Sequence, residues 1–289
     1  MDSRNNIKTI GICEREYPQI LKNIKDPPKV IYCAGDITLL DRISAAVVGT
    51  RKCSQYGRQT AMRIGRVLGK NHVTVVSGMA CGIDAFAHAG ALEAGGGTIA
   101  VLGCGPDICY PNENKKIYEA IRKNGLIISE YPPGTPPKPW QFPLRNRIIS
   151  GLAAVTVVVE AGTGSGAVIT AQAAADQGRD VMAVPGNINS PYSLGTNKLI
   201  ADGAMIVTVP EDILRTVNIE PVLETEDMEN MGTDEQKIYH LLSEKGEMSM
   251  EEICEKMKID SFTANGIVSV MEMKGIISYC LGKIFIAKS

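Results

Sequence analysis

Three short loops of the chain combine glycine with hydroxyl or guanidinium side chains, and each follows an apolar run. Their residues are Gly49, Thr50 and Arg51 in the first loop, Ser77, Gly78 and Gly82 in the second, and Ser165, Gly166 and Thr170 in the third. Glycine lets a backbone turn sharply, and amide groups at a helix start bind anions. Arginine adds a planar fork that fits phosphate, although a surface ion pair is the alternative for Arg51 taken alone. Together the loops predict a rim that binds phosphate groups.

The segment 131–150 (YPPGTPPKPWQFPLRNRIIS) places aromatic and basic side chains among six prolines. That much proline predicts a stiff, exposed loop. Aromatic rings beside guanidinium groups can stack bases and hold a phosphate backbone. The residues that we expect to do so are Lys138, Phe142, Arg145, Asn146 and Arg147.

The alternative for this segment is that its large side chains hold it to the core. For Trp140, the only tryptophan in the chain, packing is the prediction, because a large ring more often packs than recognises a ligand. For Phe142, contact with a base is the prediction. Arg145 stays open between a phosphate contact and a structural ion pair.

From residue 44 onward, short apolar runs alternate with helix-like stretches. The strongest strand patterns lie at 44–49, 73–77, 98–102, 126–129 and 154–160. Strands that are apolar on both faces and alternate with helices predict an α/β fold: an extended Rossmann-like, mostly parallel sheet with helices on both faces. Ligands of such sheets bind at the carboxyl ends of the strands, where the strand order reverses. We therefore expect the three loops to meet at one edge.

The chain is expected to divide into four segments. Residues 1–43 would be an N-terminal extension packed on the core, and residues 44–210 the Rossmann-like binding domain. Residues 211–232, with one basic and seven acidic side chains, would be an acidic linker. Residues 233–289 predict three helices and a β-hairpin, which is a winged-helix-like domain. Its third helix is poor in basic residues, so we expect it to contact protein rather than bases.

Composition narrows the class of protein. Residues 1–210 carry 22 Lys and Arg against 16 Asp and Glu, a balance that suits a polyanionic partner. The eight cysteines have no C-x-x-C spacing, which predicts reduced thiols and no metal site. The chain has no apolar run of membrane-spanning length and no secretory signal pattern, so we expect a cytoplasmic protein without a membrane partner.

Several longer motifs carry a resemblance to a known family. They are Val47–Arg51, Ser77–His88, Tyr110-Pro111, Ser129–Gly134, Phe142–Ile149, Val159–Ala161, Ser165-Gly166, Ile169–Ala171 and Ala183–Gly186. Their identity and order resemble the DNA-processing protein A family (DprA, also called Smf) over residues 11 to about 213.

This resemblance implies an extended Rossmann domain that binds single-stranded DNA as a homodimer, without a nucleotide cofactor. It implies a recombination mediator that protects incoming DNA and loads a RecA-type recombinase during natural transformation. Arg51 would hold a backbone phosphate, and the turns at Ser77-Gly78 and Ser165-Gly166 would line the same pocket.

The resemblance also assigns roles within the segment 131–150. Phe142 would lie against a base, and Arg145 and Arg147 would supply charge, helped by Lys138. Cys81 stands where an arginine is expected, so the pocket would carry one positive charge fewer.

Two other functions stay open. A nucleotide-processing enzyme of a related Rossmann group would carry a P-G-G-x-G-T-x-x-E loop, and here no glutamate follows the region 160–166 in the helix start. Asp84 could act as a base, but nothing pairs with it in the sequence, and His88 is expected to be packed. A nucleotide-binding sensor would use the same rim for a nucleotide that controls dimerisation. The preferred prediction has no catalytic residue and no cofactor.

Overall fold

A computed structural model describes residues 7–220, 231–274, 276–280 and 282–286. The chain divides into two compact units, Met1–Pro221 and Val222–Ser289. None of the described helices is long and apolar enough to cross a membrane.

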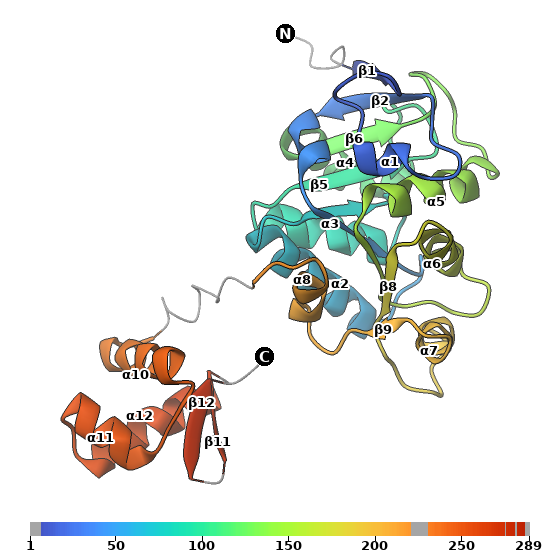
Figure 1. Cartoon of the computed structure of the whole chain (residues 1–289). Helices are drawn as coiled ribbons and strands as arrows, with labels where there is room; N and C mark the ends of the chain where they lie inside the picture. The colour runs from blue at the N-terminus through green and yellow to red at the C-terminus, as the bar shows by residue number, and fades with distance from the viewer. Residues whose placement is uncertain (1–6, 221–230, 275, 281, 287–289) are drawn as a thin grey trace. The chain divides into compact units, whose positions relative to one another are not determined.

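The first unit is built on a nine-stranded sheet in the order β1-β2-β6-β5-β4-β3-β7-β8-β9 (Figure 1). The pairs β1–β2 and β2–β6 are antiparallel, and the other pairs are parallel. The strands are β1 (Ile7–Gly11), β2 (Val30–Gly35), β3 (Ser44–Val48), β4 (Thr74–Ser77), β5 (Thr98–Leu102), β6 (Leu126–Ser129), β7 (Val155–Val158), β8 (Asp180–Ala183) and β9 (Met205–Ile206).

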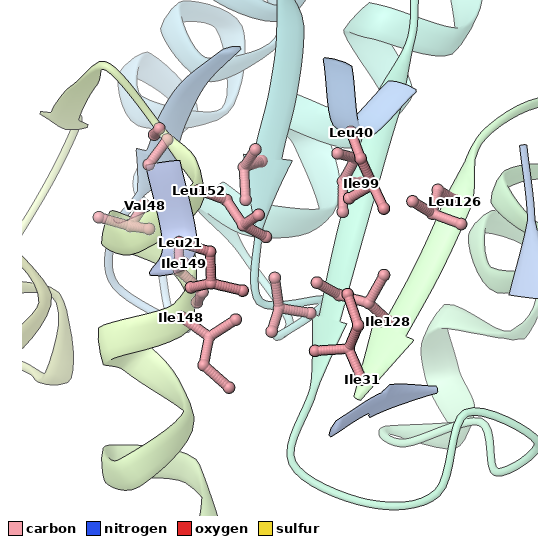
Figure 2. Packing of buried hydrophobic residues seen from close by; sticks show 14 of the residues in the cluster. Leu21, Ile31, Leu40, Val48, Ile99, Leu126, Ile128, Ile148, Ile149 and Leu152 are labelled. Carbon is pink, nitrogen blue, oxygen red and sulfur yellow. The ribbon is translucent and has the colours of Figure 1, made fainter. Parts of the chain in front are cut away.

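Helices cover both faces of this sheet, and the residues of the central strand alternate between them. Ala46 and Val48 of β3 pack with helices α1, α5 and α6, and Figure 2 shows part of this cluster. Ala45 and Val47 pack with α2, α3 and α8 on the other face. The α-helices of the unit are α1 (Gln19–Lys22), α2 (Gln55–Lys70), α3 (Ile83–Glu93), α4 (Lys115–Asn124), α5 (Gln141–Leu152), α6 (Gly166–Asp176), α7 (Leu194–Ala201) and α8 (Glu211–Thr216), and a 3-10 turn, η2 (Ile37–Asp41), precedes β3.

The described residues of the second unit form three helices and a small antiparallel sheet in the order β10-β12-β11. Its elements are α10 (Thr233–Lys245), β10 (Glu247–Met248), α11 (Met250–Met257), α12 (Ser261–Met273), β11 (Ile277–Cys280) and β12 (Lys283–Ile286). Ser249 caps α11, since its hydroxyl accepts the amide of Glu252. The predicted fold class, a mostly parallel α/β sheet with a small C-terminal module, is thus confirmed.

Residues 1–43 pack on the core, where Leu21 and Ile31 are buried, and their strands β1 and β2 also extend the sheet as antiparallel edge strands. Two local expectations are wrong. The acidic linker does not begin at residue 211, because α8 buries Ile213 and Leu214 in the core; residues 221–230 lie outside the described residues. The segment 131–150 is a loop only in its first part, because α5 begins at Gln141 and its first turn accommodates Pro143.

Helices α2 and α3 pack with their backbones in direct contact. A Cβ atom on Gly65 of α2 would collide with the carbonyl oxygen of Ala87 in α3, and one on Gly90 of α3 would collide with the carbonyl oxygen of Met62. Any larger side chain at these positions must push the helices apart.

We therefore predict that Gly65→Ala lowers the stability of the first unit by about 2 kcal/mol, as overpacking typically does. Thermal unfolding followed by circular dichroism measures this. The matched control is Gly266→Ala in α12, where a new Cβ meets nothing within 4 Å. That control should leave its unit as stable as before or slightly more stable. Equal, negligible effects of both substitutions would contradict the close helix contact.

Candidate functional site

The strand order reverses between β3 and β7, and a pocket opens at the carboxyl ends of these two strands. The loop after β3, the loop after β7 and the start of α5 line it. Nine of the fourteen predicted residues are among its lining: Gly49, Thr50, Arg51, Phe142, Arg145, Asn146, Ser165, Gly166 and Thr170. The topological argument from the sequence therefore places the pocket at the edge where these loops meet.

One wall of the pocket is a stack of two rings and a guanidinium group. The rings of Tyr110 and Phe142 lie 5.3 Å apart at 21°, and the Arg51 guanidinium carbon lies 5.9 Å from the centre of the Phe142 ring. Sequence reasoning missed Tyr110, although it follows the glycine-rich loop after β5. The stack can receive a flat ring while the cation contacts an anionic group beside it.

The exposed charge of the pocket comes from Arg51 and Lys52. Within the described part of the chain, no ion pair engages either side chain. Two adjacent cations that pair with no carboxylate of the described residues suit an anionic ligand.

The loop after β7 forms the opposite wall and leads into the start of α6. The Ser165 hydroxyl accepts the amide of Ala167 and caps the helix. Thr170 donates to the carbonyl oxygen of Gly166 over 3.2 Å, and the Asn146 side-chain amide donates to the same oxygen over 3.3 Å. The amide of Ser165 donates to the carbonyl oxygen of Gly162, and the amide of Val168 donates to that of Ser165. Among the described residues, the amide of Gly166 has no such acceptor, and it lies at the start of a helix, where anions bind.

The glycine turn after β4 is already occupied by the protein's own carboxyl group. Asp84 accepts the amides of Gly78 at 3.1 Å and Ala80 at 3.3 Å. The Ser77 hydroxyl is buried and donates to the carbonyl oxygen of Val47 at 2.6 Å. The expectation that Ser77 and Gly78 bind phosphate is therefore wrong, because their polar groups are satisfied internally.

Gly82 also acts through the fold. It has a φ of 80° and lies so close to the first loop that a Cβ atom would meet the carbonyl oxygen of Arg51 at 2.6 Å. Only glycine fits this contact without strain. Gly82 supports the loop that carries Arg51 and is not part of the pocket lining.

Arg145 lies at the floor of the pocket and is buried there. Its side chain is 5% exposed, and its guanidinium group donates to the carbonyl oxygens of Gly78 and Val101. Burial lowers the pKa of Arg145 to about 10, and the neighbouring Asp84 opposes this shift, so the group stays charged at neutral pH. The structure thus favours the structural alternative over the expected phosphate contact.

Burial also raises the pKa of the Asp84 carboxyl group, while Arg145 and the amide donors oppose that effect. The two side chains flank Gly78, where a Cβ atom would meet Arg145 Nη2 at 2.6 Å and Asp84 Oδ2 at 2.9 Å. Together they form the polar floor of the pocket.

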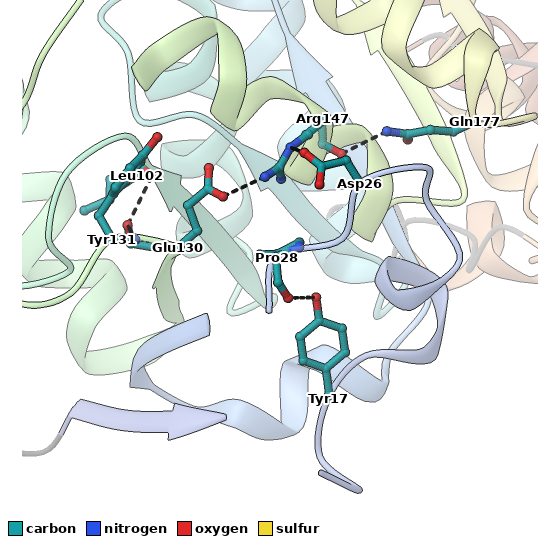
Figure 3. Close-up of polar contacts among 9 residues, drawn as sticks. Tyr17, Asp26, Pro28, Leu102, Glu130, Tyr131, Arg147 and Gln177 are labelled. Atoms are coloured by element: carbon teal, nitrogen blue, oxygen red, sulfur yellow. Dashed lines mark hydrogen bonds and ion pairs between the residues drawn. The ribbon is translucent and has the colours of Figure 1, made fainter. Parts of the chain in front are cut away.

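Arg147 points away from the pocket, so the expectation that it supplies charge there is wrong. Its Nη2 atom lies 2.6 Å from Glu130 Oε2, and its Nε atom lies 3.3 Å from Asp26 Oδ2 (Figure 3). These contacts tie α5 to the N-terminal segment. Lys138 is exposed but does not line the pocket.

Glu160, which the sequence reasoning did not select, positions the Arg51 loop. Its backbone carbonyl oxygen accepts the amide of Thr50 at 2.8 Å. Its buried carboxyl group accepts the amide and the hydroxyl of Ser54, the residue that caps α2. The loop after β3 is therefore held at both ends by Glu160, two residues after the end of β7.

Residues 8–218 match the sequence model of the family described as DNA recombination-mediator protein A. The chain belongs to this family. It is 43% identical to the DNA processing protein DprA of Bacillus subtilis over 208 residues, which cover 72% of this chain and 70% of that protein. The match to DprA of Streptococcus pneumoniae is 43% over 206 residues, covering 71% and 73% of the two chains.

Solved DprA structures share the fold of the first unit. The X-ray structure of DprA from Streptococcus pneumoniae aligns with a TM-score of 0.71 at 40% identity and covers 77% of each chain. DprA from Helicobacter pylori, described for its single-stranded DNA binding mode, aligns with a TM-score of 0.68 at 32% identity. That alignment covers 76% of this chain and all of the other.

The contrast between Arg145 and Arg51 gives a second prediction. Arg145→Ala should lower the free energy of unfolding by about 3–5 kcal/mol, because it leaves a buried carboxyl group without its partner. Arg51→Ala, at an exposed position, should change it by no more than about 0.5 kcal/mol. Urea unfolding of the two variants measures both values. Equal stability of the two variants would show that Arg145 is not part of the floor.

Proposed function

We propose that this protein binds single-stranded DNA in the pocket between β3 and β7 and has no catalytic activity. The stack of Tyr110, Phe142 and Arg51 carries the proposal, since it offers ring surfaces to a base and a cation to the adjacent phosphate. The single-stranded DNA binding mode described for the Helicobacter pylori relative supports it.

The proposed phosphate contacts are Arg51 and Lys52 from one loop and the amide of Gly166, which follows Ser165, from the other. Phe142 would stack a base, and Asn146 would hold the second loop in place through Gly166. Gly49 belongs to the site through its backbone, because a side chain there would collide with Ile83. Thr50 and Thr170 complete the lining.

The pocket gives little support to catalysis. Asp84 is the carboxyl group among its lining residues, and two amides already hold it. His88 is fully buried, with Nδ1 2.7 Å from the Thr98 hydroxyl, and burial lowers its pKa to about 3. His88 is therefore neutral and lies away from the pocket lining. Among the described residues, no cluster of His, Cys, Asp and Glu could hold a metal ion.

We propose further that the chain acts as a recombination mediator in the cytoplasm: it protects incoming strands and loads a RecA-type recombinase onto them during natural transformation. The description of its family as recombination mediators supports this role. The C-terminal unit, proposed to be a winged helix, would contact protein. Helix α12 contains no lysine or arginine, and Lys274 follows directly after it.

A homodimer is the proposed assembly, formed through the β9 edge of the sheet. Large apolar side chains are exposed along this edge and the adjoining α7, among them Ile188, Leu194, Met205 and Ile206. An apolar edge strand without cover is prone to pair with another chain.

Arg51→Ala should weaken binding of fluorescent oligo-dT and reduce the slope of log Kd against log salt by about one, as expected for one lost phosphate contact. Fluorescence anisotropy across a salt series provides the measurement, with duplex DNA of equal length as competitor. The control is Arg63→Ala on the exposed side of α2, which should leave both quantities unchanged. Unchanged binding by the Arg51 variant would refute the proposed site.

Ile206→Glu should convert the dimer to a folded monomer, because a charge at the centre of an apolar contact costs several kcal/mol unless it is paired. Light scattering after size exclusion determines the mass. Ile43→Glu is the matched control, since Ile43 is 48% exposed and Ile206 47% exposed. A dimer that survives Ile206→Glu, or dissociates equally with Ile43→Glu, would place the interface elsewhere.

A further inference from the structure

A second pair of aromatic rings lies just beyond the pocket. The rings of Tyr131 and Trp140 are 6.1 Å apart and nearly perpendicular, at 82°. Tyr131 follows β6, the strand next to β5, whose following loop supplies Tyr110. The two aromatic pairs therefore succeed one another along the carboxyl edge of the sheet.

Trp140 is open to solvent, which the packing prediction did not anticipate. Its side chain is 54% exposed, whereas Gln141, the next residue, is 1% exposed. Indole rings have a large apolar surface, and hiding it from water is favourable. An exposed indole on the same sheet edge as the proposed DNA pocket therefore suits a ligand with a flat face.

The backbone around Trp140 is held in one conformation. The amide of Gln141 donates to the carbonyl oxygen of Lys138 at 3.0 Å, and the Gln141 side-chain oxygen accepts the amide of Lys138. Prolines at 136, 137 and 139 restrict the same stretch. The indole is thus presented by an ordered turn, so little conformational entropy is lost when a ligand stacks on it.

The spacing suits a continuous strand. Pro139 and Phe142 line the pocket, and Trp140 lies between them in the sequence, at most about 7 Å from Phe142 between Cα atoms. The loops that carry the two aromatic pairs are joined, because the amide of Gly105 donates to the carbonyl oxygen of Thr135 and the amide of Gly134 donates to Asp107. Lys138, two residues before Trp140, is exposed, and its ammonium group suits a phosphate.

We propose that Trp140 is a second base-stacking site, which receives a base of the same strand after it leaves the pocket past Phe142, with Lys138 contacting the phosphate between them. This inference rests on the proposed function and extends the bound length of single-stranded DNA. A base fits this position better than a protein side chain, because the site continues a row of rings and cations.

The experiment uses the full chain, in which Trp140 is the only tryptophan and therefore the only source of indole fluorescence. Labelled oligo-dT of about 2 and about 16 nucleotides is titrated, with binding read from anisotropy of the label and stacking from quenching of the indole. The long oligomer should quench the indole, and the short one, held in the pocket, should bind without full quenching.

Substitution supplies the second readout. Trp140→Ala should weaken binding of the long oligomer about tenfold and leave binding of the short one unchanged. Trp140→Phe keeps an aromatic ring and should retain most of the affinity for the long oligomer. Phe262→Ala, which removes the 90% exposed ring of α12, is the control and should change neither.

The outcomes separate this inference from the proposed function. If both oligomers bind, but the indole emission stays constant and Trp140→Ala binds like the unaltered protein, the second site is refuted while DNA binding stands. If neither oligomer binds at low salt, the proposed function itself fails. An indole that responds to a partner protein and not to DNA would also overturn the inference.

Discussion

The site depends on the opposite charges of Asp84 and Arg145, which are buried on either side of Gly78. Asp84 accepts the amides of the turn after β4, and Arg145 donates to carbonyl oxygens of the same turn and of β5. Neither group can be removed alone without leaving a buried polar partner unsatisfied, which costs several kcal/mol. The pair therefore fixes the floor of the pocket and, through α5, the position of Phe142.

The glycine-rich loops have different roles, although their sequences are similar. In the turn after β4, the amides of Gly78 and Ala80 donate to Asp84, so this turn stabilises the site. The loops after β3 and β7 keep their exposed groups for a ligand, and Glu160 joins them. Charge at the rim comes from Arg51 and Lys52, and flat surfaces come from the aromatic side chains beside them.

The parallel core of the sheet could be predicted because its strands are apolar on both faces, as in the run around Val157. The strands β1 and β2 and the helix α8 could not, because their burial depends on partners far away in the sequence, such as the contact of Ile213 with the core. For the same reason the sequence could not show which arginine faces a ligand, because Arg51, Arg145 and Arg147 carry the same side chain. Only the fold places Asp84 near Arg145 and Glu130 against Arg147.

The reversal of strand order also makes the pocket a joint property of two halves of the sheet. One half runs outward from β3 through β4 and β5, and the other from β7 through β8. The amide of Thr50 in the first half donates to Glu160 in the second. A fragment or folding intermediate that contains one half of the sheet would lack a complete rim. Binding of single-stranded DNA would therefore be confined to chains in which the whole sheet has assembled.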